Sequence, residues 1–311
     1  MASWNNAPPL LQVAASQQGG SRGAQVWGVT KDYGLTSSYQ ETPGGSWSAW
    51  MAPPWVAGGP TSVVQVTASQ QNDGRVQLWV TDQQEQLWSI WQTSPGGGWS
   101  AWSGPNWNGA PKALVQICAC QQGGPRGAQI WATTPTGKFQ TAYQVSPGGG
   151  WSTWQDFRNP PGLNADPPPL IDLAAAEQNN GQAQLWGLDQ KEQLWTVWQT
   201  VPGGSWTGWV GPWGGPVSLQ TLAASQQGGA RGAQLWATDA KNQVWSTYQE
   251  TPGGGWALWL GPNWAGAPTF IQMAAAQQNN GCVQVWGIDA NLSLKSITQS
   301  SPGGGWGKWG P

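Results

Sequence analysis

Residues 77–102 read QLWVTDQQEQLWSIWQTSPGGGWSAW, and this segment is the clearest indication of the fold. It contains two short segments rich in aliphatic and aromatic residues, separated by an Asp-containing turn. A Pro-Gly-Gly turn then leads to Trp99 and Trp102. Short segments of this composition, bounded by Gly, Pro, Asn or Asp, are typical of β-strands. Almost the same frame returns at residues 184–209, so the stretch is one unit of a repeat.

Six copies of this unit fill the chain. In the first copy we expect strands a, b, c and d at residues 11–16, 24–27, 35–40 and 47–50. The strand-b Trp precedes a strand-c Gln by 13 residues in all six copies, and that Gln precedes the first strand-d Trp by 7. The constant spacing fixes the strand register inside each unit. The strand-b tryptophans are Trp27, Trp79, Trp131, Trp186, Trp236 and Trp286, and each copy carries two more on strand d.

The connections between copies predict a closed ring. They range from 17 to 23 residues, and joining the two termini would create a connection of 19. An open solenoid would need atypical capping units, and none is visible. We therefore predict an all-β, six-bladed β-propeller of four-stranded antiparallel blades in a single domain. The repeats cover about 8–59, 60–110, 111–166, 167–215, 216–266 and 267–311, with 1–7 completing the ring.

A second period alternates along the six blades. Odd blades carry an Arg-Gly a–b loop and end strand c with a Tyr. Even blades carry a shorter Asn-Gly or Asp-Gly turn, the type that suits a two-residue hairpin. The ring is therefore predicted to be a threefold array of alternating blade pairs. Its inter-blade pockets should be of two alternating kinds.

The large repeated side chains are interpreted as core. We expect the strand-b and strand-d tryptophans to fill the gap between adjacent sheets, with their indole N–H groups hydrogen-bonded. The repeated glutamines should bond loop and backbone groups. Cys118 and Cys120 alternate along one strand and are expected to be small core residues.

Composition excludes several function classes. Charged residues make up 8% of the chain and the net charge is −2, so no basic stripe indicates nucleic acid as a partner. The residues from Met1 onward show no secretory signal, and no apolar run has the length of a membrane span. We therefore expect no membrane insertion. The expected localisation is the cytoplasm, or secretion without a standard signal peptide.

Catalysis is not expected. The chain has no His, and its three Cys residues have neither zinc-site nor disulfide spacing, so no metal or other cofactor is predicted. A glycosidase needs two facing carboxylates. The acids here lie mostly in b–c turns, where turn chemistry explains them. These turn acids are Asp82, Asp189, Asp239 and Asp289.

The first candidate binding residues are the tryptophans of the Gly/Pro/Asn linkers. We expect them to be partly exposed, so that the ring stacks on a sugar while nearby amides bind hydroxyls. The alternative is that each one fills the gap under its own blade. The third linker has Phe157 in place of Trp, so a pocket there should be altered. The linker tryptophans are Trp4, Trp55, Trp107, Trp213 and Trp264.

A second candidate set lies on the face that carries the a–b and c–d loops. Arg22 is expected to approach Glu41, and Arg231 to approach Glu250. Arg126 lacks such a partner because Val145 replaces the acid. The alternative is an exposed ion pair of little energetic consequence. The strand-c tyrosines of the same blades, Tyr39, Tyr143 and Tyr248, complete the candidate set.

The repeat resembles that of known propeller lectins. The pattern at 77–102 and 184–209 is similar to that of bacterial lectins of the Photorhabdus fucose-lectin type, and the six-unit length resembles the fungal Aleuria-type fucose lectins. The resemblance implies shallow pockets between blades that take fucose or O-methylated sugars. Aleuria-type pockets use an Arg and a Glu in most repeats, whereas Glu41 and Glu250 are the only strand-c-end acids here.

Two hypotheses follow for function. The first is a multivalent lectin that recognises neutral sugars on cell-surface glycans or glycoproteins. The second is a structural or protein-interaction propeller whose tryptophans are purely core. The sequence does not specify the sugar or the oligomeric state.

Overall fold

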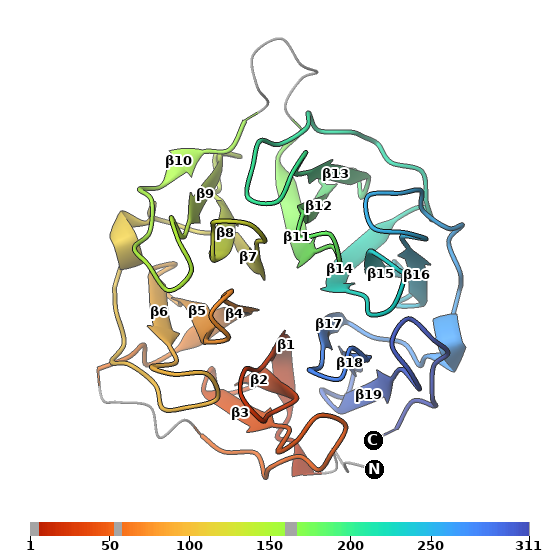
Figure 1. The fold of residues 1–311 in the computed structure, drawn as a ribbon, viewed down its shortest axis with the longest axis horizontal. Helices are drawn as coiled ribbons and strands as arrows, with labels where there is room; N and C mark the ends of the chain where they lie inside the picture. Colours follow the sequence, from red (N-terminus) through yellow and green to blue (C-terminus); the bar gives the residue numbers. More distant parts are fainter. Residues whose placement is uncertain (1–5, 53–57, 159–166, 311) are drawn as a thin grey trace.

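The computed structural model describes residues 6–52, 58–158 and 167–310, which form six antiparallel sheets around a central axis (Figure 1). The blades are, in order, β1 (Leu10–Gln17), β2 (Ala24–Thr30), β3 (Leu35–Tyr39); β4 (Val63–Gln70), β5 (Val76–Asp82), β6 (Leu87–Trp91); β7 (Gln116–Gln121), β8 (Ala128–Thr133), β9 (Phe139–Tyr143), β10 (Gln155–Asp156); β11 (Leu170–Glu177), β12 (Ala183–Asp189), β13 (Leu194–Trp198); β14 (Leu219–Gln226), β15 (Ala233–Asp239), β16 (Val244–Tyr248); β17 (Gln272–Gln277), β18 (Val283–Ile288), β19 (Leu294–Thr298). Two short 3-10 turns, η2 (Trp107–Gly109) and η3 (Trp264–Gly266), lie in linkers.

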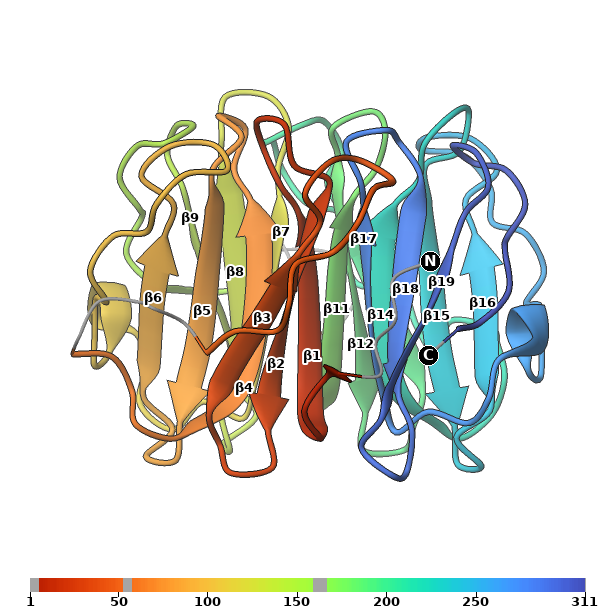
Figure 2. The same cartoon turned by 90° about the horizontal axis from the view of Figure 1, so that it is seen from below.

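The six-bladed propeller is confirmed, and the ring is closed. The first strand of each blade contacts the first strand of the next, and β17 contacts β1. The closing interface also carries hydrogen bonds, including Leu10 N to Leu292 O at 3.0 Å and Val13 N to Gln272 Oε1 at 3.0 Å. The strands run between two opposite faces of the ring (Figure 2). Because neighbouring strands are antiparallel, the a–b and c–d loops share one face, here called the loop face.

The fourth strand is weaker than the sequence predicts. Within the described residues, only blade 3 has a fourth strand that pairs continuously, β10. In the first blade, isolated bridges join Gln40 to Trp47 and Ser37 to Met51. Between these two bridges, two residues of β3 thus face three on the outer segment, and this extra residue breaks the ladder as a β-bulge does.

A tryptophan pair joins each blade to the next. The strand-b Trp packs edge-on against the first outer-segment Trp of the following blade, with ring centroids 5.5–6.2 Å apart and interplanar angles of 83–90°. The strand-b rings are fully buried. The predicted packing role is therefore confirmed. The pairs are Trp27–Trp99, Trp79–Trp151, Trp131–Trp206, Trp186–Trp256, Trp236–Trp306 and Trp286–Trp47.

Within the described residues, the expected indole hydrogen bonds are not formed at five of the six strand-b tryptophans. Five strand-b indole N–H groups find no hydrogen-bond acceptor among the described residues. The gap between blades offers ring faces and aliphatic side chains instead of oxygen atoms. The T-shaped contacts, worth about 0.5–1.5 kcal/mol each beyond their buried area, offset part of this cost. The five are Trp27, Trp79, Trp131, Trp186 and Trp236.

Removing one member of a Trp pair tests its contribution. We expect Trp236→Ala to lower the free energy of unfolding by about 3–5 kcal/mol, because it leaves a cavity between blades 5 and 6. Leu258→Ala is the control, since Leu258 is 88% exposed and belongs to the same blade. Chemical denaturation followed by near-UV circular dichroism measures both. A loss for Trp236→Ala no larger than that of the control would contradict the pairing argument.

Candidate functional site

Three arginine–tyrosine pairs stand at threefold positions on the loop face. In each odd blade the guanidinium lies over the ring of the Tyr that ends the third strand. The distances from Cζ to the ring centroid are 4.0 Å for Arg22 over Tyr39, and 3.9 Å both for Arg126 over Tyr143 and for Arg231 over Tyr248. All six side chains are half-buried. We call these the Arg–Tyr sites.

Three blades meet at each Arg–Tyr site. An Asn of the preceding blade donates to the carbonyl oxygen of the Arg, as Asn279 does to Arg22. The c–d loop of the following blade lies against the Arg side chain at its Gly, as Gly96 does beside Arg22. The same contacts are repeated by Asn72 and Gly203 around Arg126 and by Asn179 and Gly303 around Arg231.

A glycine allows the Arg loop to fold this tightly. A Cβ at Gly23 would lie 1.8 Å from Oε1 of Gln40, and the same clash exists at Gly127 and Gly232. Buried glutamines also join the blades beneath the loop. Gln92 accepts from Val76 N at 2.9 Å and donates to Gln18 of the preceding blade at 2.7 Å. This supports the predicted bonding role of the glutamines and shows that it extends across blade interfaces.

The expected arginine–glutamate ion pairs are not formed. Arg22 and Arg231 pair with neither Glu41 nor Glu250 among the described residues. Glu41 instead accepts a hydrogen bond from Ser46 Oγ at 2.7 Å. Each guanidinium is held by a ring face, and within the described part of the chain its N–H groups make no hydrogen bond. Pre-positioned donors of this kind are available to a ligand.

The expected exposure of two linker tryptophans is wrong. Trp107 and Trp264 are each 6% exposed. Their rings pack on the Trp pair beneath, for example Trp107 on Trp151 at 5.0 Å and on Trp79 at 5.9 Å. The left-handed backbone at Asn106 and Asn263 turns each ring inward.

The other linker aromatics differ in exposure. Trp213 is half-buried and packs on Trp256 at 5.2 Å. Phe157 takes the equivalent place in the third linker, between Trp131 and Trp206. Trp4 and Trp55 lie outside the described residues.

The turn acids have structural partners. Asp82 Oδ1 accepts from the backbone N–H of Gln84 and Gln86 at 2.9 Å each, and Oδ2 accepts from Trp88 Nε1 at 2.8 Å. Asp189 and Asp239 repeat this pattern. The turn interpretation of these acids is confirmed. Within the described residues no group of three or more Cys, Asp or Glu could hold a metal ion, and no helix is long and apolar enough to span a membrane.

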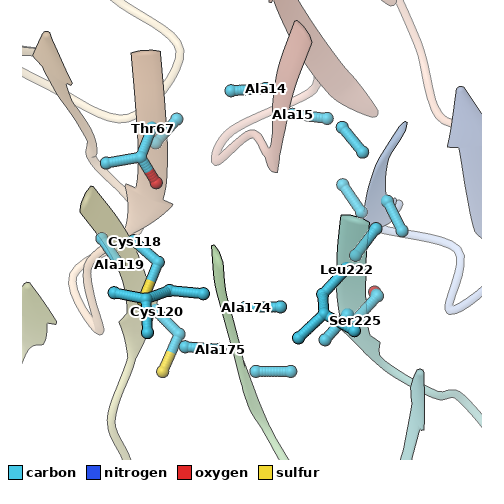
Figure 3. Close-up of a pocket in the computed structure, with 18 of the residues that line it drawn as sticks. Ala14, Ala15, Thr67, Cys118, Ala119, Cys120, Ala174, Ala175, Leu222 and Ser225 are labelled. Atoms are coloured by element: carbon cyan, nitrogen blue, oxygen red, sulfur yellow. The ribbon is translucent and has the colours of Figure 1, made fainter. Parts of the chain in front are cut away.

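A cavity of about 340 Å³ follows the ring axis (Figure 3). The first strands line it, with Ala174 and Ala175 among the small side chains that face it. Among the described residues that line it, Asp172 and Glu177, both on β11, are the only acids, and none is Lys or Arg. Burial raises the pKa of each carboxyl group to about 7.

Two thiols, Cys118 and Cys120, line this cavity. Burial is the main cause that raises the pKa of Cys118 and Cys120 well above the usual range of a thiol. Both side chains are buried. The predicted role as small core residues is confirmed, since both belong to a buried hydrophobic cluster.

Sequence reasoning missed the Asn residues that hold the Arg–Tyr sites. Asn72, Asn179 and Asn279 belong to the short a–b turns of the even blades, and no interface role was predicted for them from the sequence. In the structure they reach across the interface, where each also accepts from a Gln of the next blade, as Asn179 does from Gln226 at 2.9 Å. The strict alternation of odd and even loops could have indicated these contacts, because it places an Asn-bearing loop directly before an Arg-bearing loop at every second blade interface.

Comparison with solved structures finds a similar fold in several proteins, two of them lectins by title. BP39L lectin from Burkholderia pseudomallei is 22% identical, with a TM-score of 0.63 over 96% of this chain and 83% of that one. AofleA from Arthrobotrys oligospora is 15% identical, with a TM-score of 0.68 over 97% and 86%. The Aleuria aurantia lectin, a six-bladed β-propeller with a fucose recognition mode, is 13% identical, with a TM-score of 0.67 over 98% and 97%. No family model and no curated protein matches the sequence.

Glu177 gives a test of the axial cavity. Its pKa is about 7 in the folded protein, against an ordinary value of 4.5. The favourable contribution of the protonated acid is therefore complete below pH 4 and is lost as the pH rises through 7. We expect Glu177→Gln to raise the free energy of unfolding by about 1–3 kcal/mol at pH 8 and to change it little at pH 4.

Thermal or chemical denaturation at the two pH values measures this difference. Gln277→Glu is the reverse variant, since Gln277 holds the equivalent place on β17 and also lines the cavity. It should destabilise the protein at pH 8. Equal stability of Glu177→Gln and the parent at both pH values would contradict the burial argument.

Proposed function

We propose that the protein is a non-enzymatic, multivalent lectin that binds neutral sugars at the Arg–Tyr sites, with fucose-like or O-methylated sugars as the ligands. The observation that carries the proposal is the threefold repetition of a guanidinium fixed on a tyrosine ring, with its donors free of partners among the described residues. A structural role alone would not require donors to be left unused at three equivalent places.

The chemistry of each site suits a hydroxyl-rich ligand. The guanidinium presents several N–H donors in a fixed plane, which can bond adjacent sugar hydroxyls. The c–d loop of the following blade brings backbone groups close, because Gly96 and its counterparts carry no side chain. The half-buried tyrosine ring offers apolar surface to the C–H face of a pyranose.

The linker tryptophans enter the proposal in different ways. Trp213 keeps a half-buried ring and is retained as a second stacking surface. Trp107 and Trp264 are retained as residues that position the neighbouring rings, since each is 6% exposed. Trp4 and Trp55 stay in the candidate set by sequence alone.

The structural neighbours support this choice. The Aleuria aurantia lectin is called fucose-specific, and SapL1 lectin is seen in complex with α-methyl fucoside; both have the fold described above. Three sites on one face would engage a glycan-bearing surface together, and linked engagement raises avidity roughly 10²–10⁴-fold. Multivalent binding to cell-surface glycans or glycoproteins therefore follows.

A second candidate function is a protein-interaction scaffold. Val217 and Leu258, both near blade 5, are 84% and 88% exposed. Exposed apolar side chains of this size are common at interaction surfaces when they form a patch. This scaffold would bind a protein partner and no glycan.

A charge-matched pair of triple variants separates the two functions. Arg22→Ala/Arg126→Ala/Arg231→Ala should lower binding to fucosylated or O-methylated glycans by at least about tenfold, since each lost charged hydrogen bond costs roughly 1.5–3 kcal/mol. Lys31→Ala/Lys191→Ala/Lys241→Ala is the control, with the same change of charge at exposed b–c turns on the opposite face. A glycan array followed by competition with the free monosaccharide measures both.

The outcomes are distinct. Selective binding that survives in the lysine variant and is lost in the arginine variant supports the proposal. Equal binding by both folded variants would move the sugar site away from the Arg–Tyr pairs. A parent protein that binds no glycan would favour the scaffold.

A further inference from the structure

The three Arg–Tyr sites have the same geometry but different charged surroundings. The residue two places after the tyrosine, at the start of the c–d loop, is Glu41 in blade 1, Val145 in blade 3 and Glu250 in blade 5. All three are exposed, and each backbone N–H closes the same loop, for example Val145 N to Gly150 O at 3.0 Å. The c–d loop thus has the same backbone hydrogen bond in all three blades, but blade 3 has no carboxylate at this position.

A second difference lies on the other side of the same loop. Arg75, in the a–b turn of blade 2, stands where blades 4 and 6 carry Gln182 and Cys282. Its guanidinium is fixed by Asp73 at 2.7 Å and reaches the blade-3 c–d loop, since a Cβ at Gly148 would lie 2.3 Å from Arg75 Nη2. Gly44 and Gly253, the equivalent positions, face neutral amides of Asn280 and Asn180.

The formal charges of the three sites therefore differ. Arg22 with Glu41, and Arg231 with Glu250, are each neutral as a set. Arg126 with the Arg75–Asp73 pair keeps one positive charge. At all three sites the guanidinium donors are free of partners among the described residues, so the charge of the surroundings distinguishes them.

We infer that the Arg126–Tyr143 site selects a glycan with an anionic substituent, a carboxylate or a sulfate ester, while the sites of Arg22 and Arg231 take neutral sugars. The inference rests on the proposed function. A guanidinium with two parallel donors matches the paired oxygens of either anion. Glu41 and Glu250 would repel such a group, and Val145 does not. The protein would then bind both neutral and anionic glycans through one face.

The test isolates each site in the full-length protein. Arg22→Ala/Arg231→Ala leaves the Arg126 site, and Arg126→Ala/Arg231→Ala leaves the Arg22 site. Each variant is titrated calorimetrically with the methyl glycoside of one hexose, with its uronate and with its 6-sulfate. The Arg126 site should prefer an anionic form over the neutral one by about tenfold, the size of one charge interaction across a few ångströms at a protein surface. Added salt should weaken that preference.

The chain supplies the reciprocal controls. Val145→Glu in the Arg126-only protein should remove the preference, and Glu41→Val in the Arg22-only protein should create it. The uronate and sulfate arms tell which anion is favoured, and near-UV circular dichroism confirms that each variant is folded.

Three results would overturn the inference. A neutral hexose bound by the Arg126 site as tightly as its uronate and its sulfate would do so while leaving the lectin proposal intact. An anionic preference of the Arg126 site that is unchanged by Val145→Glu would also overturn the inference and leave the lectin proposal intact. Absence of any sugar binding by the parent protein would overturn the inference together with the proposed function.

Discussion

The edge-to-face contact between tryptophans of adjacent blades is the interaction on which the rest of the structure depends. Six such pairs run round the ring, and Trp286–Trp47 closes it between the last and first blades. A three-stranded sheet cannot bury its own faces, so every blade depends on its neighbours for a core. The rings fill the widening gap between sheets, which small aliphatic side chains could not fill. This explains the large share of Trp in the sequence.

A rigid ring allows its loops to differ. Because the Trp pairs and the cross-blade glutamines fix each interface, the loop face can alternate between Arg-bearing and Asn-bearing loops without altering the blades. The Asn of one blade holds the Arg loop of the next, so the functional unit is an interface and not a blade. Three equivalent interfaces result. A single residue difference, such as Val145 in place of a Glu, can then change the charge at one of them alone.

Much of the fold could be predicted from the sequence, and less of the site. Constant spacings fixed the blades, the register and the ring, because side-chain periodicity and turn residues carry that information locally. The hydrogen bonds of five strand-b indoles, the exposure of Trp107 and the Arg22–Glu41 ion pair were wrongly predicted. Each depends on which neighbour a side chain meets across an interface. Arg22 Cζ lies 4.0 Å from the ring centroid of Tyr39 in the same blade. The local sequence pattern does not indicate that the guanidinium packs on this ring instead of pairing with the carboxylate of Glu41.

A crystal structure of the protein with a bound neutral monosaccharide, such as α-methyl fucoside, would show directly whether the Arg–Tyr sites bind sugar. We expect sugar density over the guanidinium groups of Arg22 and Arg231, with sugar hydroxyls accepting from the arginine N–H donors. Density confined to the linkers, beside Trp107 or Trp264, would contradict the assignment of the Arg–Tyr pairs as the binding sites.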